Sequence, residues 1–141
     1  MGLLKKGKYQ VVFPSHIKYL PEAEDLTSRI SKELLFDEDA RDDLSIAITE
    51  LFNNALHHGN KNDASKKITI TFTVLSGGLQ ISVRDEGKGF EPAKIKNPLD
   101  EENILKTSGR GLFLVEQLVD EIDYKVSPKG SEVIVFKKFK K

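Results

Sequence analysis

The sequence predicts an α+β fold: a two-layer α/β sandwich in which helices cover one face of a mixed, mostly antiparallel sheet. Segments that alternate apolar and polar residues indicate half-buried strands, and segments with apolar residues every three or four positions indicate amphipathic helices. The order along the chain is strand, helix, helix, hairpin, long loop, helix, hairpin. Strands that come mostly as hairpins, with helices between them, favour this architecture over a parallel sheet.

Length and composition indicate one ordinary globular domain covering residues 1–141. The chain is 38% hydrophobic and 31% charged. Its 22 Lys and Arg balance its 22 Asp and Glu, so no overall positive charge favours nucleic acid, and we expect no direct nucleic-acid partner. There are no cysteines, which excludes disulfides and thiolate chemistry. With no apolar run of about 18 residues and no signal peptide, we expect no membrane contact and a cytoplasmic location.

The first half of the chain reads as a strand and two helices. "YQVVFPSH" is a short strand that Pro14 stops. A helix follows from Leu20, and a second helix runs from about Asp39 to His58, with Gly59 as its stop. The predicted core-facing positions are Leu20, Ala23, Leu26, Ile30 and Leu34 on the first helix, and Leu44, Ile48, Leu51 and Ala55 on the second.

The second half contains two hairpins and a third helix. Ile68, Ile70, Phe72 and Val74 alternate with polar residues, "SGG" turns the chain, and Leu79, Ile81 and Val83 alternate again. A loop from about residue 91 to 108 is long enough to act as a lid over a site, and disorder without function is the alternative. A helix then begins near Gly111, and the chain ends in the hairpin "IDYKV-SPKG-SEVIVFKKF". That helix carries Leu112, Leu114, Val115, Leu118 and Val119.

Glu50 and Asn54 lie one turn apart on the second helix, beside its apolar stripe. At the edge of a buried face, a carboxylate can act as a general base, and an amide oxygen one turn away suits Mg²⁺. The alternative is a pair of ordinary surface residues near a helix end. His57 and His58 suggest a metal site less well, because adjacent residues point to different sides of a helix.

Asp85 continues the apolar face of its strand, in "RDEGKGF", so the alternation places a carboxylate on the core side at a strand end. A buried carboxylate needs hydrogen-bond donors, and a ligand with an exocyclic amine, such as adenine, would supply one. Gly87 and Gly89 would let the backbone turn and approach that ligand. A strand that simply ends in a D-x-G turn is the alternative.

Gly109, Arg110 and Gly111 stand immediately before the third helix in "TSGRGLFLVEQLVDEI". Free amides at a helix start bind phosphate, glycines allow close approach, and Arg110 could add charged hydrogen bonds. The alternative is a glycine loop that only joins the lid to the helix. The C-terminal run "KKFKK", Lys137 to Lys141, is interpreted as a solvated strand end and tail rather than a lipid or nucleic-acid contact.

Taken in order, these motifs resemble the nucleotide-binding boxes of the GHKL (histidine kinase-like) ATPase superfamily. The order is E-x-x-x-N on a helix, a hairpin ending in D-x-G-x-G, a lid, and G-x-G opening a helix, and the resemblance spans about Val11 to Phe139. With "FPSHIKYLPEAEDLTSRI", a short lid and no other domain, the chain looks most like the RsbW-type anti-sigma factor serine kinases. The superfamily fold is the α/β sandwich predicted above.

The resemblance implies ATP and Mg²⁺ as cofactors and a role for each motif residue. Glu50 matches the general base, Asn54 the Mg²⁺ ligand and Asp85 the carboxylate that binds the adenine amine. Ser131 stands where relatives often have Thr near adenine. The remaining matches are Gly87 and Gly89 in the second box and Gly109, Arg110 and Gly111 in the phosphate-binding box.

One position departs from the pattern. Some sporulation-type relatives have Arg two residues before the first glycine of the phosphate box, and here that residue is Thr107. Lys106 or Arg110 could supply the missing positive charge. If neither does, we expect ATP to bind but phosphoryl transfer to be slow.

The resemblance further implies a serine kinase that phosphorylates a STAS-type anti-anti-sigma partner and regulates a sigma factor, as a homodimer. A non-catalytic ATP-binding module that sequesters its partner is the alternative. A two-component histidine kinase is disfavoured, because no helix pair with a phosphoacceptor histidine precedes the domain and His16 lies in a loop-like stretch.

Overall fold

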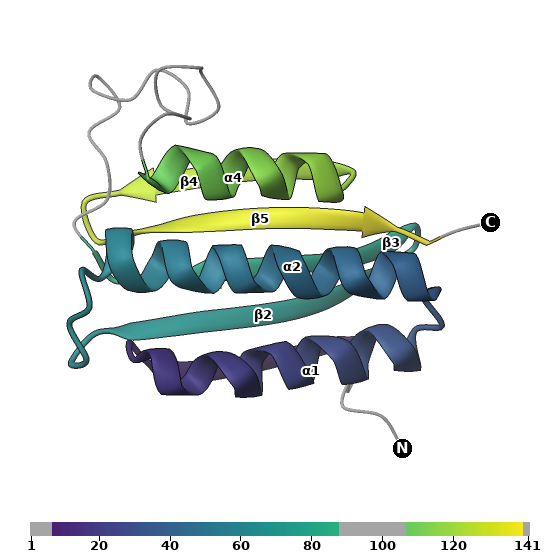
Figure 1. Ribbon diagram of the computed structural model, residues 1–141, viewed down its shortest axis with the longest axis horizontal. Coiled ribbons are helices and arrows are strands. Elements are labelled where there is room, and N and C mark those ends of the chain that lie inside the picture. Colours follow the sequence, from purple (N-terminus) through teal and green to yellow (C-terminus); the bar gives the residue numbers. More distant parts are fainter. Residues whose placement is uncertain (1–6, 88–106, 140–141) are drawn as a thin grey trace.

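The computed structural model describes residues 7–87 and 107–139, and the side chains of residues 107–110 are not included in that description. Within these ranges, five strands form one sheet in the order β1-β2-β3-β5-β4, and three α-helices pack on one of its faces (Figure 1). The strands are β1 (Lys8–Pro14), β2 (Lys67–Leu75), β3 (Gly78–Arg84), β4 (Glu121–Ser127) and β5 (Gly130–Lys138). The helices are α1 (Leu20–Glu33), α2 (Glu38–Asn54) and α4 (Thr107–Leu118).

Helices on one face of the sheet confirm the predicted two-layer sandwich (Figure 1). Every neighbouring pair of strands in the described sheet is antiparallel, so the sheet is not mixed. The reason lies in the path from β3 through α4 to β4. The two strands run in the same direction, but β5 lies between them and pairs antiparallel with both. A parallel contact is thereby avoided, although a helix connects the two strands.

The helix boundaries follow local capping. A 3-10 turn, η1 (Ile17–Tyr19), leads into α1, and a proline occupies the first turn of α1. The Asp37 side chain accepts a hydrogen bond of 2.8 Å from the Ala40 amide and caps α2. The last turn of the predicted second helix is π-helical, η2 (Ala55–Gly59), and it ends at the predicted glycine.

The core lies between the helices and the sheet. The inward faces of β2 and β3 are as the alternation predicted, and the stripe of α2 is buried throughout. In α4, Leu112 and Val115 are buried, but Leu114 is 39% exposed, because α4 packs on α2 through one side only. The largest fully buried side chains are Phe52, Phe72, Ile30, Leu44, Ile48, Leu51, Leu56, Ile68, Ile70, Leu79, Ile81 and Val115.

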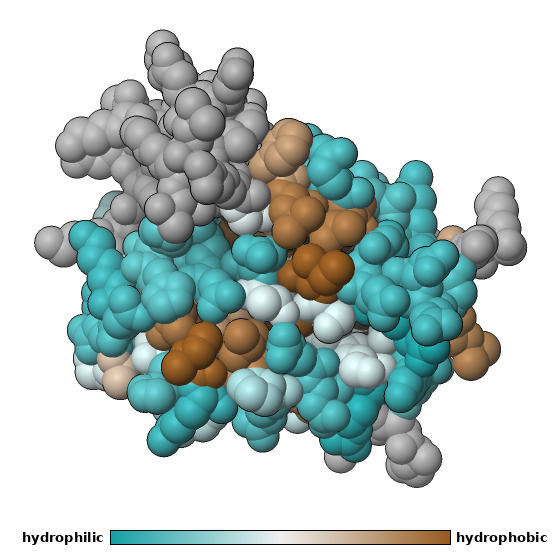
Figure 2. Space-filling model, in the orientation of Figure 1, coloured by the Kyte–Doolittle hydropathy of each residue, from teal (hydrophilic) through white to brown (hydrophobic). Residues whose placement is uncertain are grey.

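On the helical side, α2 lies between α1 and α4, and the chain direction of α4 is opposite to that of α2 (Figure 1). The surface of this side is mostly hydrophilic, with apolar surface over α2 and α4 (Figure 2). Ile46, Phe113 and Leu114 are the exposed large hydrophobic residues of these two helices. None of the described helices has the length and apolar character to cross a membrane.

Candidate functional site

Asp85 is buried directly after β3, with 3% of its surface exposed, on the core side as the alternation predicted. Its Oδ1 accepts hydrogen bonds from the amides of Gly87 (2.9 Å) and Ser131 (3.1 Å). Its Oδ2 accepts from the Ser131 hydroxyl at 2.7 Å. These donors come from the chain itself and explain how the carboxylate tolerates burial. The structure therefore brings Asp85, Gly87 and Ser131 together.

The backbone packs closely around this carboxylate at Gly59 and Gly87. A Cβ at Gly59 would lie 2.1 Å from Asp85 Oδ2, and a Cβ at Gly87 would lie 2.0 Å from the Gly59 carbonyl oxygen. A side chain at Gly59 would displace the hydrogen-bonded Asp85 carboxylate, and one at Gly87 would displace the backbone of Gly59. Gly59 was predicted only as a helix stop, and the structure adds contact with Asp85.

Glu50 lies against the first turns of α4. A Cβ placed on Gly111 would approach Glu50 Oε2 to 2.9 Å, so the glycine leaves the room that the carboxylate occupies. The contact depends on α2 and α4 packing side by side in opposite directions, which brings the late part of α2 to the early part of α4 (Figure 1). Glu50 thus lies beside the N-terminal end of α4, where the sequence predicts phosphate binding.

The glycines of this segment lie inside the helix, whereas the sequence predicted them before it. Helix α4 begins at Thr107, so Gly109, Arg110 and Gly111 belong to its first turns, and so do the last two residues of the predicted lid. The first four amides of any helix lack intrahelical acceptors. Backbone donors therefore remain in this segment, and the low helix propensity of glycine costs little at an end.

Asn54 ends α2, one turn after Glu50. Its Oδ1 is buried and has no hydrogen-bond partner among the described residues. Such an orphaned hard oxygen fits Mg²⁺, which commonly takes few protein ligands and completes its shell with phosphate and water oxygens. Within the described ranges no group of three or more His, Asp or Glu could hold a metal by itself. The residues present therefore fit a magnesium ion that arrives with a phosphate ligand.

The two histidines occupy different environments, as their adjacency predicted. His57 is exposed and its Nδ1 lies 2.8 Å from Asn62 Oδ1. His58 is half-buried, and burial is the larger cause that lowers its pKa below 6.5, followed by the charge of His57. Neither of them belongs to a group of side chains that could hold a metal within the described part of the chain. His16 caps η1, accepting a hydrogen bond from the Lys18 amide through Nδ1.

Asn60 is a buried polar residue that sequence analysis did not select. It has 0% exposure, and its Nδ2 donates to the Ser15 hydroxyl and, at 2.9 Å, to the Lys67 carbonyl. Its Oδ1 accepts from the Glu86 amide at 2.8 Å, beside Asp85. One side chain thus joins the end of η2 to the residue after β1, to β2 and to the turn after β3. An Asn that follows Gly is typical of a surface turn, so nothing local in the sequence indicated its burial.

Gly89, Lys106 and the predicted lid up to residue 106 lie outside the described residues, as do the side chains of Thr107 and Arg110. The assignments made for them stay predictions.

Comparison with known proteins identifies relatives over nearly the whole chain. The profile of the histidine kinase-like ATPase domain matches residues 13–137. A serine-protein kinase RsbW from Oceanobacillus iheyensis is 27% identical over 132 residues, which are 89% of this chain and 82% of the relative. The protein of the same name from Listeria monocytogenes is 26% identical over 82% of this chain and 77% of the relative. That from Bacillus subtilis is 31% identical over 67% of this chain and 63% of the relative.

Solved structures agree on the fold. The RsbU and RsbW domains of a Mycobacterium tuberculosis protein match 94% of this chain with a TM-score of 0.70 and 19% identity. The chain spans only 32% of that longer structure. The mycobacterial sensor histidine kinase MprB matches 93% of this chain and 97% of its own, with a TM-score of 0.59 and 14% identity. At these identities the likeness establishes the fold alone.

Proposed function

The chain belongs to the histidine kinase-like ATPase domain family, and we propose that it is an ATP-dependent protein serine kinase and anti-sigma factor. Its substrate would be a serine on a STAS-type anti-anti-sigma protein. The kinase would bind and release a sigma factor in the bacterial cytoplasm and so regulate transcription. The name serine-protein kinase, which its relatives carry, supports serine as the acceptor.

A homodimer is part of the proposal, and light scattering on the purified chain tests it.

The contact between Glu50 and Gly111 is the observation that carries the proposal. Phosphoryl transfer needs positioning and charge neutralisation more than covalent chemistry by the protein. In this arrangement the free amides of the first turn of α4 would hold phosphate oxygens. Glu50, beside that turn, would accept the proton of the attacking serine hydroxyl.

The part of the site around Asp85 would hold the adenine. Asp85 accepts three hydrogen bonds from the protein. A carboxylate offers about four lone-pair positions, so one remains for the exocyclic amine of adenine. Ser131 would fix the orientation of the carboxylate, and Gly87 and Gly89 would line the approach to the base.

Magnesium would lie between the phosphates and the end of α2. Asn54 would contribute its orphaned Oδ1 to the ion. The ion, when bound, would neutralise charge on the phosphates, and the role of the protein is to hold Asn54 one turn from Glu50 on a rigid helix. Gly109 and Arg110 would complete the phosphate box.

Transfer of labelled phosphate tests the proposal. The chain is incubated with γ-labelled ATP, Mg²⁺ and a STAS-domain protein from the same cell, and label on the serine of that protein is the expected result. Glu50→Gln should reduce the transfer rate by about 10²–10⁴-fold because the base is lost, with ATP affinity retained. Asp42→Asn, which removes an exposed carboxylate of the same helix, is the matched control and should transfer at the wild-type rate.

Two outcomes would contradict the proposal. Binding of ATP and of the STAS protein without any label on the latter would favour the non-catalytic sequestering module. Retained transfer by Glu50→Gln would remove Glu50 from the role of base.

A further inference from the structure

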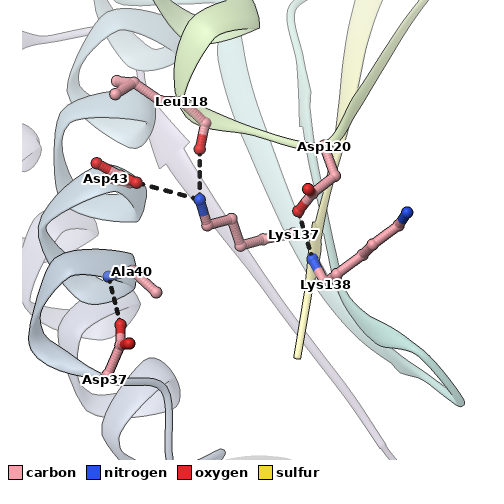
Figure 3. Close-up of polar contacts among 7 residues, drawn as sticks. All are labelled: Asp37, Ala40, Asp43, Leu118, Asp120, Lys137 and Lys138. Carbon is pink, nitrogen blue, oxygen red and sulfur yellow. Dashed lines mark hydrogen bonds and ion pairs between the residues drawn. The ribbon is translucent and has the colours of Figure 1, made fainter. Parts of the chain in front are cut away.

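Lys137 belongs to the C-terminal basic run, yet it is not part of a solvated tail. Only 16% of its side chain is exposed, and it shares the inward face of β5 with the buried Val133 and Val135. Its ammonium lies 3.1 Å from Asp43 Oδ2 on α2 and donates to the Leu118 carbonyl at 2.7 Å (Figure 3). The prediction of a solvated strand end is wrong for this residue, because β5 continues to pack under the helices.

The bond to Leu118 has a clear physical basis. Leu118 is the last residue of α4, and the last carbonyls of a helix have no intrahelical donor. An ammonium at this end satisfies such a carbonyl and is favoured by the helix dipole. Asp43, 35% exposed, holds the same ammonium from the side of α2.

Two hydrogen bonds of Asp120, one from its backbone amide and one to its side chain, fasten the same end of α4 to β5. The Asp120 amide donates to the Phe136 carbonyl at 2.9 Å. Asp120 Oδ2 accepts from the Lys138 amide at 2.7 Å (Figure 3). The C-terminal end of α4 is therefore fixed to β5, and Lys137 alone among these contacts extends the connection to α2.

The positions of these residues relate the Lys137 contact to the candidate site. Asp43 precedes Glu50 by seven residues on α2, and Leu118 follows Gly111 by seven on α4. Seven residues are about two helical turns, or roughly 10 Å, and return to nearly the same helix face. Because α2 and α4 run in opposite directions, the Lys137 bridge and the Glu50–Gly111 contact lie at the two ends of one helix–helix interface.

We propose that Lys137 is a positioning residue for phosphoryl transfer. By bridging α2 and α4 at their far ends, it sets the register of the two helices and holds the first turns of α4 against Glu50. The proposal rests on the function inferred above. Displacement of a catalytic group by about 1 Å can cost about 100-fold in rate, so a loose register would weaken transfer without loss of the fold.

Lys137→Met tests the bridge, since methionine keeps an apolar stem of similar length and removes the ammonium. Under conditions where the variant is fully folded, kcat for transfer should fall about tenfold. Affinity for ATP should fall, whereas affinity for adenosine, which reaches only the Asp85 end, should not change. Lys138→Met is the matched control: it removes the same charge one residue later, from an exposed side chain outside the bridge, and should behave as wild type.

Lys137→Arg should restore much of the rate, because a guanidinium can reach both Asp43 and the Leu118 carbonyl. Asp43→Asn should show part of the defect. If Lys137→Met does not fold, these two variants still test the bridge.

A readout without nucleotide separates this proposal from the proposed function. In NMR spectra, Lys137→Met should shift the amide resonance of Gly111, roughly 10 Å from the mutated contact, and Lys138→Met should not. If the wild type transfers no phosphate, the kinase proposal fails while this measurement still decides the bridge. A lower melting temperature in Lys137→Met, with wild-type kcat and an unshifted Gly111 amide, would reduce Lys137 to a structural contact and overturn the inference.

Discussion

At the scale of single residues, the site depends on side chains that fill space left by glycines. Glu50 Oε2 lies where a Cβ on Gly111 would almost touch it. Gly111→Ala should therefore displace the carboxylate and reduce transfer at least about tenfold. Alanine favours a helix over glycine by about 1 kcal/mol, and the end of the Glu50 side chain can move, so stability should be unchanged or higher. Kinetics and urea unfolding of the same variant check both parts.

Loss of stability in Gly111→Ala, with transfer retained, would contradict this account. It would mean that the backbone of α4 moved while Glu50 stayed in place.

His58 predicts a pH dependence of folding stability. Burial, and then the charge of His57, lower the pKa of His58 in the folded state below 6.5. In the window between that lowered pKa and 6.5 the unfolded state binds more protons, so stability falls as the pH drops through this window. Urea midpoints for the wild type should decrease from about pH 7.5 to about pH 5.5, and His58→Gln should show a smaller decrease.

His57→Gln serves as the comparison, because it removes only the secondary cause of the pKa shift and leaves the half-buried imidazole of His58. It should keep most of the pH dependence. An unchanged decrease in His58→Gln would assign the pH dependence to other groups.

At the scale of elements, the end of η2 is joined to three separate segments through Asn60. Removing this side chain leaves the Lys67 carbonyl and the Glu86 amide without their partner. Asn60→Ala should therefore lower the free energy of unfolding by about 2–3 kcal/mol, the cost of leaving buried polar groups unsatisfied. Urea unfolding measures this, and ATP affinity should fall as well because Glu86 flanks Asp85.

Asn53→Ala is the matched control for that variant. Asn53 lies on α2 and makes no side-chain hydrogen bond to the described residues, so its loss should change stability by less than about 0.5 kcal/mol. Equal effects of the two variants would show that Asn60 has no special role.

The elements themselves follow from local pattern with few exceptions. The helical periods located α1 and α2, and the alternations located β2 and β3 with the correct residues inward. The start of α4 was placed too late, because glycine has low helix propensity and the free amides of a first turn leave no signal in the sequence. Among the apolar residues of α4, the sequence does not distinguish the buried Leu112 and Val115 from Leu114, which the one-sided packing of α4 leaves exposed.

At the scale of the whole molecule, the helices and the sheet share one core, and Phe52 lies in it with 0% exposure. Its ring packs edge-on against Phe13 of β1 at a centroid distance of 6.2 Å. Phe52→Ala should lower the free energy of unfolding by about 3–5 kcal/mol. Phe113→Ala, at a site 42% exposed, should change it by less than about 1 kcal/mol, as measured by urea unfolding. Similar losses in both variants would contradict a single core between the layers.

The sequence by itself determined the secondary structure, the inward faces and the α+β class, because side-chain periodicity is a local property of helices and strands. It also placed Asp85 on the core side, and the order of its motifs led to the correct family. The tertiary structure decided the strand order, the burial of Asn60 and Lys137, and the contacts of Glu50 with Gly111 and of Asp85 with Ser131, 46 residues further on. These contacts join distant parts of the chain. They form only when the helices have packed beside one another on the sheet, and no local sequence pattern predicts that packing.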